Sequence, residues 1–232
     1  MRQAIRSAIT VVVLLSLINP PLVVAQDDEP LGRMIGKRLG EESCAEELVF
    51  RDYVLADPGI GVLFAGEPVA LTFVALDYSS ADHAQESFDA VKRVIVDSFG
   101  EIYSADALSP PRVVSVGDIG DAAMGGIVTI QLDDVELVNG LSVVWIAVQQ
   151  GPFVVVATAI GLEGSTSDLL GIVDTTLDRW PMSSEGSFRA TYLNPDGQTV
   201  GGIWESMPRI DDMPAGYTMA AEGFDFPLQL DC

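Results

Sequence analysis

The single histidine of the chain, His83, is the first residue to weigh for catalysis. Serine and cysteine nucleophiles need a neighbouring base, and histidine supplies it most often. His83 follows Ser79, Ser80 and Asp82 at the start of a stretch with helical periodicity. No Gly-x-Ser-x-Gly nucleophile elbow occurs in the sequence. We therefore interpret His83 as a solvated helix residue and expect no histidine-based catalysis.

Zinc and phosphate sites lack the residues that they need. Cys44 and Cys232 are the only cysteines, and with one histidine they do not reproduce the close ligand spacing of a structural zinc site. Glycine-rich spots such as Gly125-Gly126 lack the Gly-Lys-Ser/Thr ending of a phosphate-binding loop. The sequence therefore predicts no metal site, no cofactor and no catalytic residue.

Calcium takes oxygen ligands, and acidic residues are abundant, so two short segments need separate consideration. The stretch 194–197, Asn-Pro-Asp-Gly, resembles part of a calcium loop, but Tyr192 and Ile203 stand where that loop requires carboxylates. We interpret it as a turn with proline at its second position. Asp118 and Asp121 could ligate a cation, although capping of nearby amides is the more ordinary role of aspartate in a turn.

Paired carboxylates raise the alternative of a glycoside hydrolase. Asp133-Asp134-Glu136 and Asp211-Asp212 could supply such pairs, yet the chemistry needs a defined separation across a cleft, which neighbours in sequence do not demonstrate. Adjacent acids are expected by chance among 34 acidic residues. Asp174-Thr175-Thr176 resembles an aspartic-protease triplet, but it lies within a predicted helix and has threonine in place of glycine.

Residues 1–25 have the order of a secretory signal. Arg2 and Arg6 form a basic start, an apolar run covers 8–18, and two prolines precede a small residue at Ala25, after which we expect cleavage. An uncleaved anchor is the alternative, but the run before the prolines is shorter than the roughly 20 residues that span a bilayer. We therefore expect export to the periplasm or the extracellular space, with no stable membrane span after cleavage.

The charge balance narrows the choice of partner. The chain has 34 acidic and 12 basic residues, for a formal net charge of −22. A surface this negative repels phosphate backbones and anionic lipids, so we expect no nucleic-acid partner. We interpret the negative surface first as a source of solubility. Binding of a cationic ligand, binding of a divalent metal and adaptation to a salty habitat are the alternative interpretations.

Apolar periodicity predicts two helices and a series of antiparallel strands. The predicted strands cover 68–77, 112–116, 122–132, 141–150 and 153–161, and a further apolar run covers 59–66. The first helix begins at the Ser79/Ser80 cap, carries a stripe of Phe88, Val91, Ile95 and Phe99, and ends at Gly100. The second begins at Ser165 or Thr166, carries Leu169, Leu170, Val173, Leu177 and Trp180 on one face, and stops at Pro181.

These elements predict an α+β fold, with an antiparallel sheet of about five to six strands, two amphipathic helices packed on it and a C-terminal hairpin tail. We expect four segments: a signal peptide over 1–25, an N-terminal lead-in over 26–58, the α+β domain over 59–182, and the hairpin and tail over 183–232. The lead-in is expected to contain a short helix near 41–49. Asn139-Gly140 and the 194–197 stretch are the expected hairpin turns.

The arrangement resembles exported bacterial domains of the PsbP/Mog1-like type, including mycobacterial kinase sensor domains and small lipoproteins. The strand and serine-capped helix over Phe73 to Phe99 and the VGDIGDAA step over 116–123 carry this resemblance, and the MPRIDDMPAGY stretch over 207–217 resembles the ends of other exported proteins. It covers roughly 59–180 and implies a domain that binds rather than catalyses. It carries no functional residue over to this chain.

Three functional hypotheses follow, from different classes. The first is a non-enzymatic, extracytoplasmic ligand-binding or sensor-like module, with the ligand unknown. The second is a structural or interaction protein of the cell envelope that docks through the tail hairpin around Trp204, which we expect to be exposed, whereas Trp145 and Trp180 are expected in the core. The third is a carboxylate-based hydrolase.

Cys44 and Cys232 suggest one disulfide in an oxidising compartment; two unpaired thiols, or pairing of Cys232 with another chain, are the alternatives. A bridge closing so long a loop stabilises by about 4–5 kcal/mol in the chain-entropy description. We expect Cys232→Ser to lower the melting temperature of the oxidised protein and to have no effect under reductant. An equal loss in both conditions, measured by thermal unfolding, would reject the bridge.

Overall fold

The computed structural model describes residues 29–56, 68–131, 141–161, 166–179, 192–193, 199–200 and 202–225. Seven strands within these ranges form one antiparallel sheet in the order β3-β4-β5-β6-β2-β1-β9. Their bounds are β1 Glu47–Leu55, β2 Ala70–Asp77, β3 Arg112–Val114, β4 Ala122–Ile130, β5 Leu141–Gln150, β6 Phe153–Gly161 and β9 Tyr217–Asp225. The predicted α+β class with an antiparallel sheet is confirmed, with more strands than expected.

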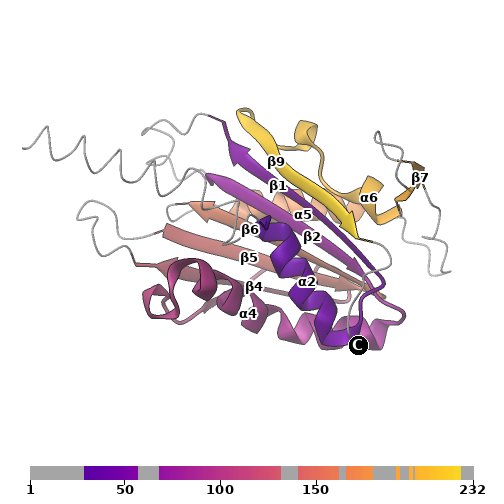
Figure 1. Ribbon diagram of the computed structural model, residues 1–232, viewed down its shortest axis with the longest axis horizontal. Helices are drawn as coiled ribbons and strands as arrows, with labels where there is room; N and C mark the ends of the chain where they lie inside the picture. Colours follow the sequence, from indigo (N-terminus) through magenta and orange to yellow (C-terminus); the bar gives the residue numbers. More distant parts are fainter. Residues whose placement is uncertain are drawn as a thin grey trace, which may run out of the picture.

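Helices cover both faces of this sheet (Figure 1). Helices α2 (Leu31–Ser43) and α4 (Ala81–Tyr103) pack on one face, followed by the 3-10 turn η2 (Ala105–Ala107). On the other face lie α5 (Thr166–Arg179), the short helix α6 (Gly202–Ser206) and the 3-10 turn η3 (Ile210–Asp212). Because neither face of the central strands meets water, β5 and β6 are apolar almost throughout and buried almost throughout.

Helix α4 confirms the predicted cap and stripe but runs beyond the predicted end. The Ser80 hydroxyl accepts a hydrogen bond from the His83 backbone N–H, and the predicted apolar stripe is buried against the sheet. The helix continues through Gly100 to Tyr103, and it is Ser104 that has a positive φ, of 77°. Ile102 and Tyr103 pack against the core, and this burial favours the extra turn over an end at Gly100.

The segment before the predicted domain is part of the fold, so the expectation of a loose lead-in with a helix near 41–49 is wrong. Helix α2 already begins at Leu31, and residues 47–55 form strand β1 between β2 and β9. The helix buries Leu31, Ile35 and Leu39 against the sheet. In β1, charged residues interrupt the apolar alternation, and tertiary partners described below allow them to be buried.

The C-terminal region also differs from the expected tail. Strands β7 (Tyr192–Leu193) and β8 (Thr199–Val200) do form a hairpin, but 202–206 is helical and 217–225 is an edge strand of the main sheet. One sheet therefore takes strands from each side of the predicted boundaries at residues 58 and 183. The predictions for 59–66, Asn139-Gly140 and Trp180 fall outside the described residues.

Asp52 is a buried carboxyl beneath the start of α2. It is 1% exposed, and its Oδ2 accepts a hydrogen bond from the Gly32 backbone N–H at 3.2 Å, where Pro30 provides no side-chain cap. Thr72, directly opposite on β2, also hydrogen-bonds to this carboxyl. A Cβ on Gly32 would lie 2.9 Å from the Phe50 Cβ, so glycine allows α2 to approach this closely. The helix start is thus capped from the sheet.

Burial raises the pKa of Asp52 from 3.8 to about 7, while its hydrogen bonds with Thr72 and Gly32 act in the opposite direction. The folded protein therefore keeps a proton that the unfolded chain releases above about pH 4. We expect the free energy of unfolding to fall by about 4 kcal/mol as the pH rises from 4 to 7 because of this group, and to level off above that.

Asp52→Asn cannot titrate and should remove that part of the pH dependence in urea unfolding between pH 4 and 8. Asp106→Asn, at an exposed position in η2, is the control and should retain the wild-type slope. Identical slopes for Asp52→Asn and the wild type would contradict the assignment.

Candidate functional site

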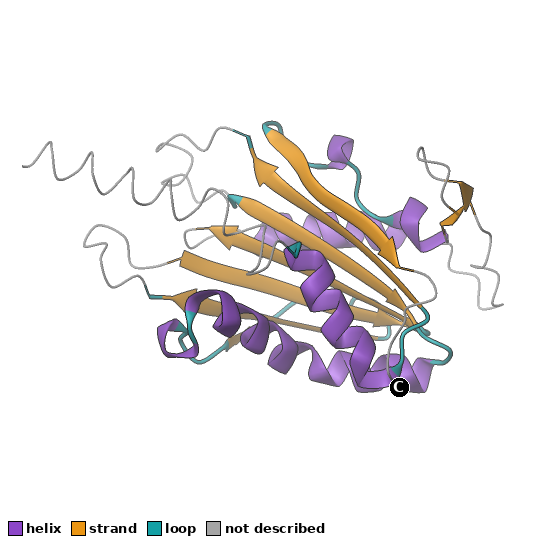
Figure 2. Cartoon of the chain, in the orientation of Figure 1, coloured by secondary structure: helices purple, strands orange, loops and turns teal. Residues whose placement is uncertain are grey.

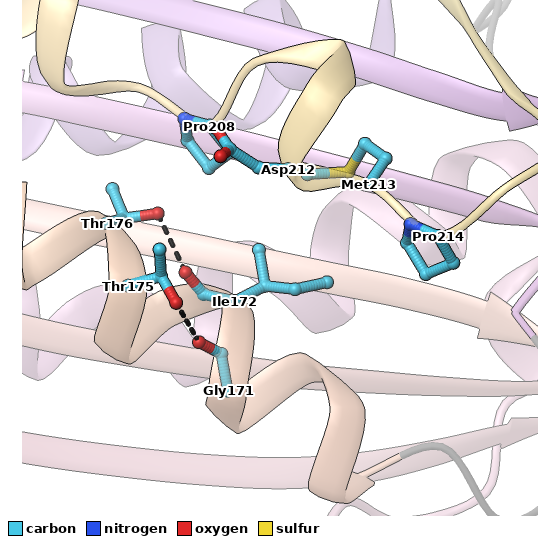
Figure 3. A pocket seen from close by; sticks show the side chains of 8 residues that line it. All are labelled: Gly171, Ile172, Thr175, Thr176, Pro208, Asp212, Met213 and Pro214. Atoms are coloured by element: carbon cyan, nitrogen blue, oxygen red, sulfur yellow. Dashed lines mark hydrogen bonds between the residues drawn. The ribbon is translucent and has the colours of Figure 1, made fainter.

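A pocket of about 450 Å³ lies between α5 and the segment that follows α6 (Figure 3). Its volume is within the range of small-molecule sites, roughly 300–1,000 Å³. Helix α5 contributes Gly171, Ile172, Thr175 and Thr176, and the C-terminal segment contributes Pro208, Asp212, Met213 and Pro214. Both walls lie on the face of the sheet opposite α2 and α4. Figure 2 shows α5 behind the sheet, with α2 and α4 in front of it. This pocket is the candidate ligand site.

The amphipathic pattern of α5 sets which side chains face the pocket. Leu169 and Val173 are buried against the sheet, so Gly171 and Thr175 lie on the exposed side of the helix. Gly171 has an ordinary helical backbone, and a Cβ added there would meet no atom within 4 Å. A helix-interior glycine is less favourable than alanine by about 1 kcal/mol, and here it leaves open space next to the pocket.

The two threonine hydroxyls of the pocket use their protons within the helix. Thr175 Oγ1 donates to the Gly171 carbonyl and Thr176 Oγ1 donates to the Ile172 carbonyl, each at 2.8 Å (Figure 3). Such bonding to the carbonyl one turn earlier is common for threonine in helices. It leaves the hydroxyl oxygens with lone pairs and without a free proton, so both act as acceptors toward the pocket.

The opposite wall is held on the sheet by Arg51 of β1, which is 5% exposed. Its Nη1 donates to the Met207 carbonyl at 3.0 Å and to the Pro208 carbonyl at 3.1 Å. The Tyr53 hydroxyl donates to the same Pro208 carbonyl at 2.5 Å. Two side chains of one strand thereby fix the chain just before η3. Because these carbonyls point toward the sheet, the residues that follow are placed against α5.

The buried guanidinium of Arg51 has both an ionic and an aromatic partner. The Glu222 Oε2, on the residue paired with Arg51 in β9, lies 3.3 Å from Nε. The guanidinium carbon lies 4.7 Å from the ring centroid of Trp204, a cation–π geometry. Trp204 is only 7% exposed as a result, and the prediction that it would be exposed on the tail is wrong. Trp145, predicted in the core, is confirmed there at 2% exposure.

Asp212 is the only carboxylate among the described residues that line this pocket. Its Oδ2 accepts a hydrogen bond from the Arg209 backbone N–H at 2.7 Å, across the 3-10 turn η3. The side chain is half-buried. Local capping of this kind fixes the direction of the carboxylate, as Asp commonly does at the start of a turn or helix.

Other residues considered for chemistry have structural positions. His83 is exposed in the first turn of α4, with its Nδ1 2.8 Å from the Ser79 Oγ. Asp121 accepts a hydrogen bond from the Gly151 backbone N–H at 2.7 Å, so it caps the turn between β5 and β6 rather than a nearby amide of its own turn. The triplet 174–176 lies in α5, as expected. The predicted Asp133-Asp134-Glu136 group is outside the described residues.

Within the described ranges, no group of three or more His, Cys, Asp and Glu side chains could hold a metal ion. Cys44, at the C-terminal end of α2, is not a free thiol. The predicted partner, Cys232, lies outside the described residues, so pairing of the two stays a prediction. No described helix is both long enough and apolar enough to cross a membrane.

Sequence reasoning missed the residues that build this pocket. Arg51, which holds one wall, interrupts an otherwise apolar run, and a charge in such a run is a signal of buried pairing that could have been used. Gly171 and Thr175 carry no such signal, because their role comes from a wall more than thirty residues away in the chain.

No known protein family matches the sequence, and no curated protein matches it. Among solved structures, the extracellular domain of PknH from Mycobacterium tuberculosis overlaps 47% of this chain and 56% of its own, with 8% identity and a TM-score of 0.29. At so low a TM-score the expected likeness to mycobacterial kinase sensor domains stays a prediction, and a PsbP/Mog1-like relationship is not shown. The overlap is too small to carry an argument about function.

Arg51→Met should loosen the wall of the pocket. It removes two charge-assisted hydrogen bonds and leaves the Met207 carbonyl without its donor, which we expect to lower the free energy of unfolding by about 2–4 kcal/mol. Amide exchange over 202–216 should accelerate more than exchange in α4. Arg112→Met removes an exposed arginine from β3 and should change neither quantity. Unchanged exchange over 202–216 in Arg51→Met would show that Arg51 does not hold this segment.

Proposed function

We propose that this protein is a non-enzymatic, extracytoplasmic ligand-binding or sensor-like module whose ligand enters the pocket between α5 and residues 208–214. The observation that carries the proposal is the pocket itself, which is of ligand size, largely apolar and bordered by a few directed polar groups. The external location rests on the leader-like order of residues 1–25.

A binding role fits the pocket better than carboxylate-based hydrolysis. Glycoside hydrolysis needs two carboxyl groups facing one another across the substrate, and Asp212 is the one carboxylate among the lining residues that the structure describes. Asp52 has the raised pKa expected of a general acid, but it is buried against α2 on the opposite face of the sheet. We therefore propose that the protein is not an enzyme.

The envelope-docking alternative loses the surface on which it was based. Trp204 stacks against Arg51 in the interior and is not available to a partner. The large apolar side chains that are exposed in the described part of the chain are Val113, Ile210 and Met219. Val113 belongs to the edge strand β3 and Met219 to the opposite edge strand β9, so they do not form one patch.

Gly171→Phe tests the binding role by filling the pocket from α5. We expect the variant to fold, because the space at Gly171 is open, and to lose binding of fragments that shift pocket amides in the wild-type NMR spectrum. Gly171→Ala is the matched control: it should stabilise the helix by about 1 kcal/mol and retain binding. Two outcomes would contradict the proposed site. One is that fragments bind Gly171→Phe with the same affinity as the wild type, and the other is that no fragment shifts the pocket amides of the wild type.

A further inference from the structure

The polar side chains of the described residues that border the pocket are all hydrogen-bond acceptors. The hydroxyl protons of Thr175 and Thr176 are committed to backbone carbonyls, so these oxygens offer only lone pairs. Asp212 adds a carboxylate. Proline nitrogens have no proton, so the Pro208 and Pro214 amides add no donor. A ligand that binds here therefore has to supply the hydrogen-bond donors.

Polar and apolar groups are separated along the pocket. In Figure 3, Asp212 and the two threonines lie toward one end, next to Pro208, whereas Ile172, Met213 and Pro214 lie toward the other. Met213 is 8% exposed, and its flexible thioether can adapt to an apolar ligand. A ligand that fills both ends has a donor group at one end and an apolar body at the other.

The surrounding charge favours a cation. Asp174 on α5 and Asp211 in η3 are exposed, and each is next to a pocket-lining residue in the chain. Arg209 is the one basic residue of the 207–214 segment. Both lysines of the chain, Lys37 and Lys92, lie on α2 and α4, which cover the other face of the sheet. A net charge of −22 adds a long-range field that concentrates cations.

Other ligand classes fit this pocket less well. An anion would meet a carboxylate and acceptor oxygens, without a side-chain donor from the described lining residues. Calcium takes six to eight oxygens, and the pocket offers one carboxylate with two hydroxyls. A wholly neutral, apolar ligand would bury the Asp212 carboxylate further without offering it a donor, and burial of a charge without a partner from the ligand is costly.

We propose that the pocket binds a protonated organic amine, with the ammonium group against Asp212 and the threonine oxygens and an apolar body against Ile172, Met213 and Pro214. This inference rests on the proposed binding function and specifies its ligand class. An ammonium group has three donors, of which the first pairs with the Asp212 carboxylate while the threonine oxygens are further acceptors along the same wall. Hydrogen bonds between charged partners are the stronger ones, so they dominate the selectivity.

Three probes of matched shape test the class: 2-phenylethylamine, 2-phenylethanol and 3-phenylpropionate, each titrated into the full mature protein at pH 7 and followed by amide shifts of α5 and residues 208–214. We expect the amine to bind at least about tenfold more tightly than the alcohol, and the carboxylate not to bind. Asp212→Asn should lower the affinity for the amine by about tenfold and leave the affinity for the alcohol unchanged.

Asp174→Asn is the matched control, because it removes the same charge from the exposed side of α5 without touching the pocket lining. It should change amine affinity less than about twofold, as screened surface charges do. If the affinity for the alcohol or for the carboxylate equals that for the amine, the proposed ligand class is wrong, although the proposed binding function stands. If none of the three shifts the pocket amides and Gly171→Phe changes no fragment binding, the binding function itself fails.

Discussion

The buried guanidinium of Arg51 holds the C-terminal segment against the sheet, and the pocket exists because of that attachment. A charge in the interior is costly unless its donors are satisfied and its charge is compensated. Two backbone carbonyls satisfy Nη1 of Arg51, and the Glu222 carboxylate and the Trp204 ring compensate its charge, although Nε makes no hydrogen bond. The segment that supplies the carbonyls then continues through η3 to form one wall of the pocket.

Strand β1 organises both layers of helices through two adjacent residues. Side chains alternate between the faces of a strand, so Arg51 reaches the C-terminal segment while Asp52 reaches the start of α2. Asp52 supplies the cap that the start of α2 lacks, and Arg51 supplies donors to the carbonyls of the chain before η3. The strand lies between β2 and β9, so both contacts start from the interior of the sheet rather than from an edge. Substitutions at these two positions should therefore affect opposite faces.

Unlike the buried surroundings of Arg51 and Asp52, the pocket is open to solvent, and its lining is only partly polar. Its polar oxygens are acceptors because helix geometry lets threonine return its proton to the carbonyl one turn back. Its apolar end comes from residues on two segments that are distant in the chain, Ile172 and Met213. Both properties are consistent with a small ligand that brings its own donors, and neither requires a second catalytic group.

The sequence alone determined the α+β class, the N-cap and stripe of α4, and the strands over 122–130, 141–150 and 153–161, because local periodicity and turn residues decide these. It did not determine β1, β9 or the burial of Trp204, which depend on partners far along the chain. The register of β1 against β9 decides that Arg51 meets Glu222. Only tertiary packing could make an interrupted apolar run into a central strand, because burial of its charges requires groups that no local pattern supplies.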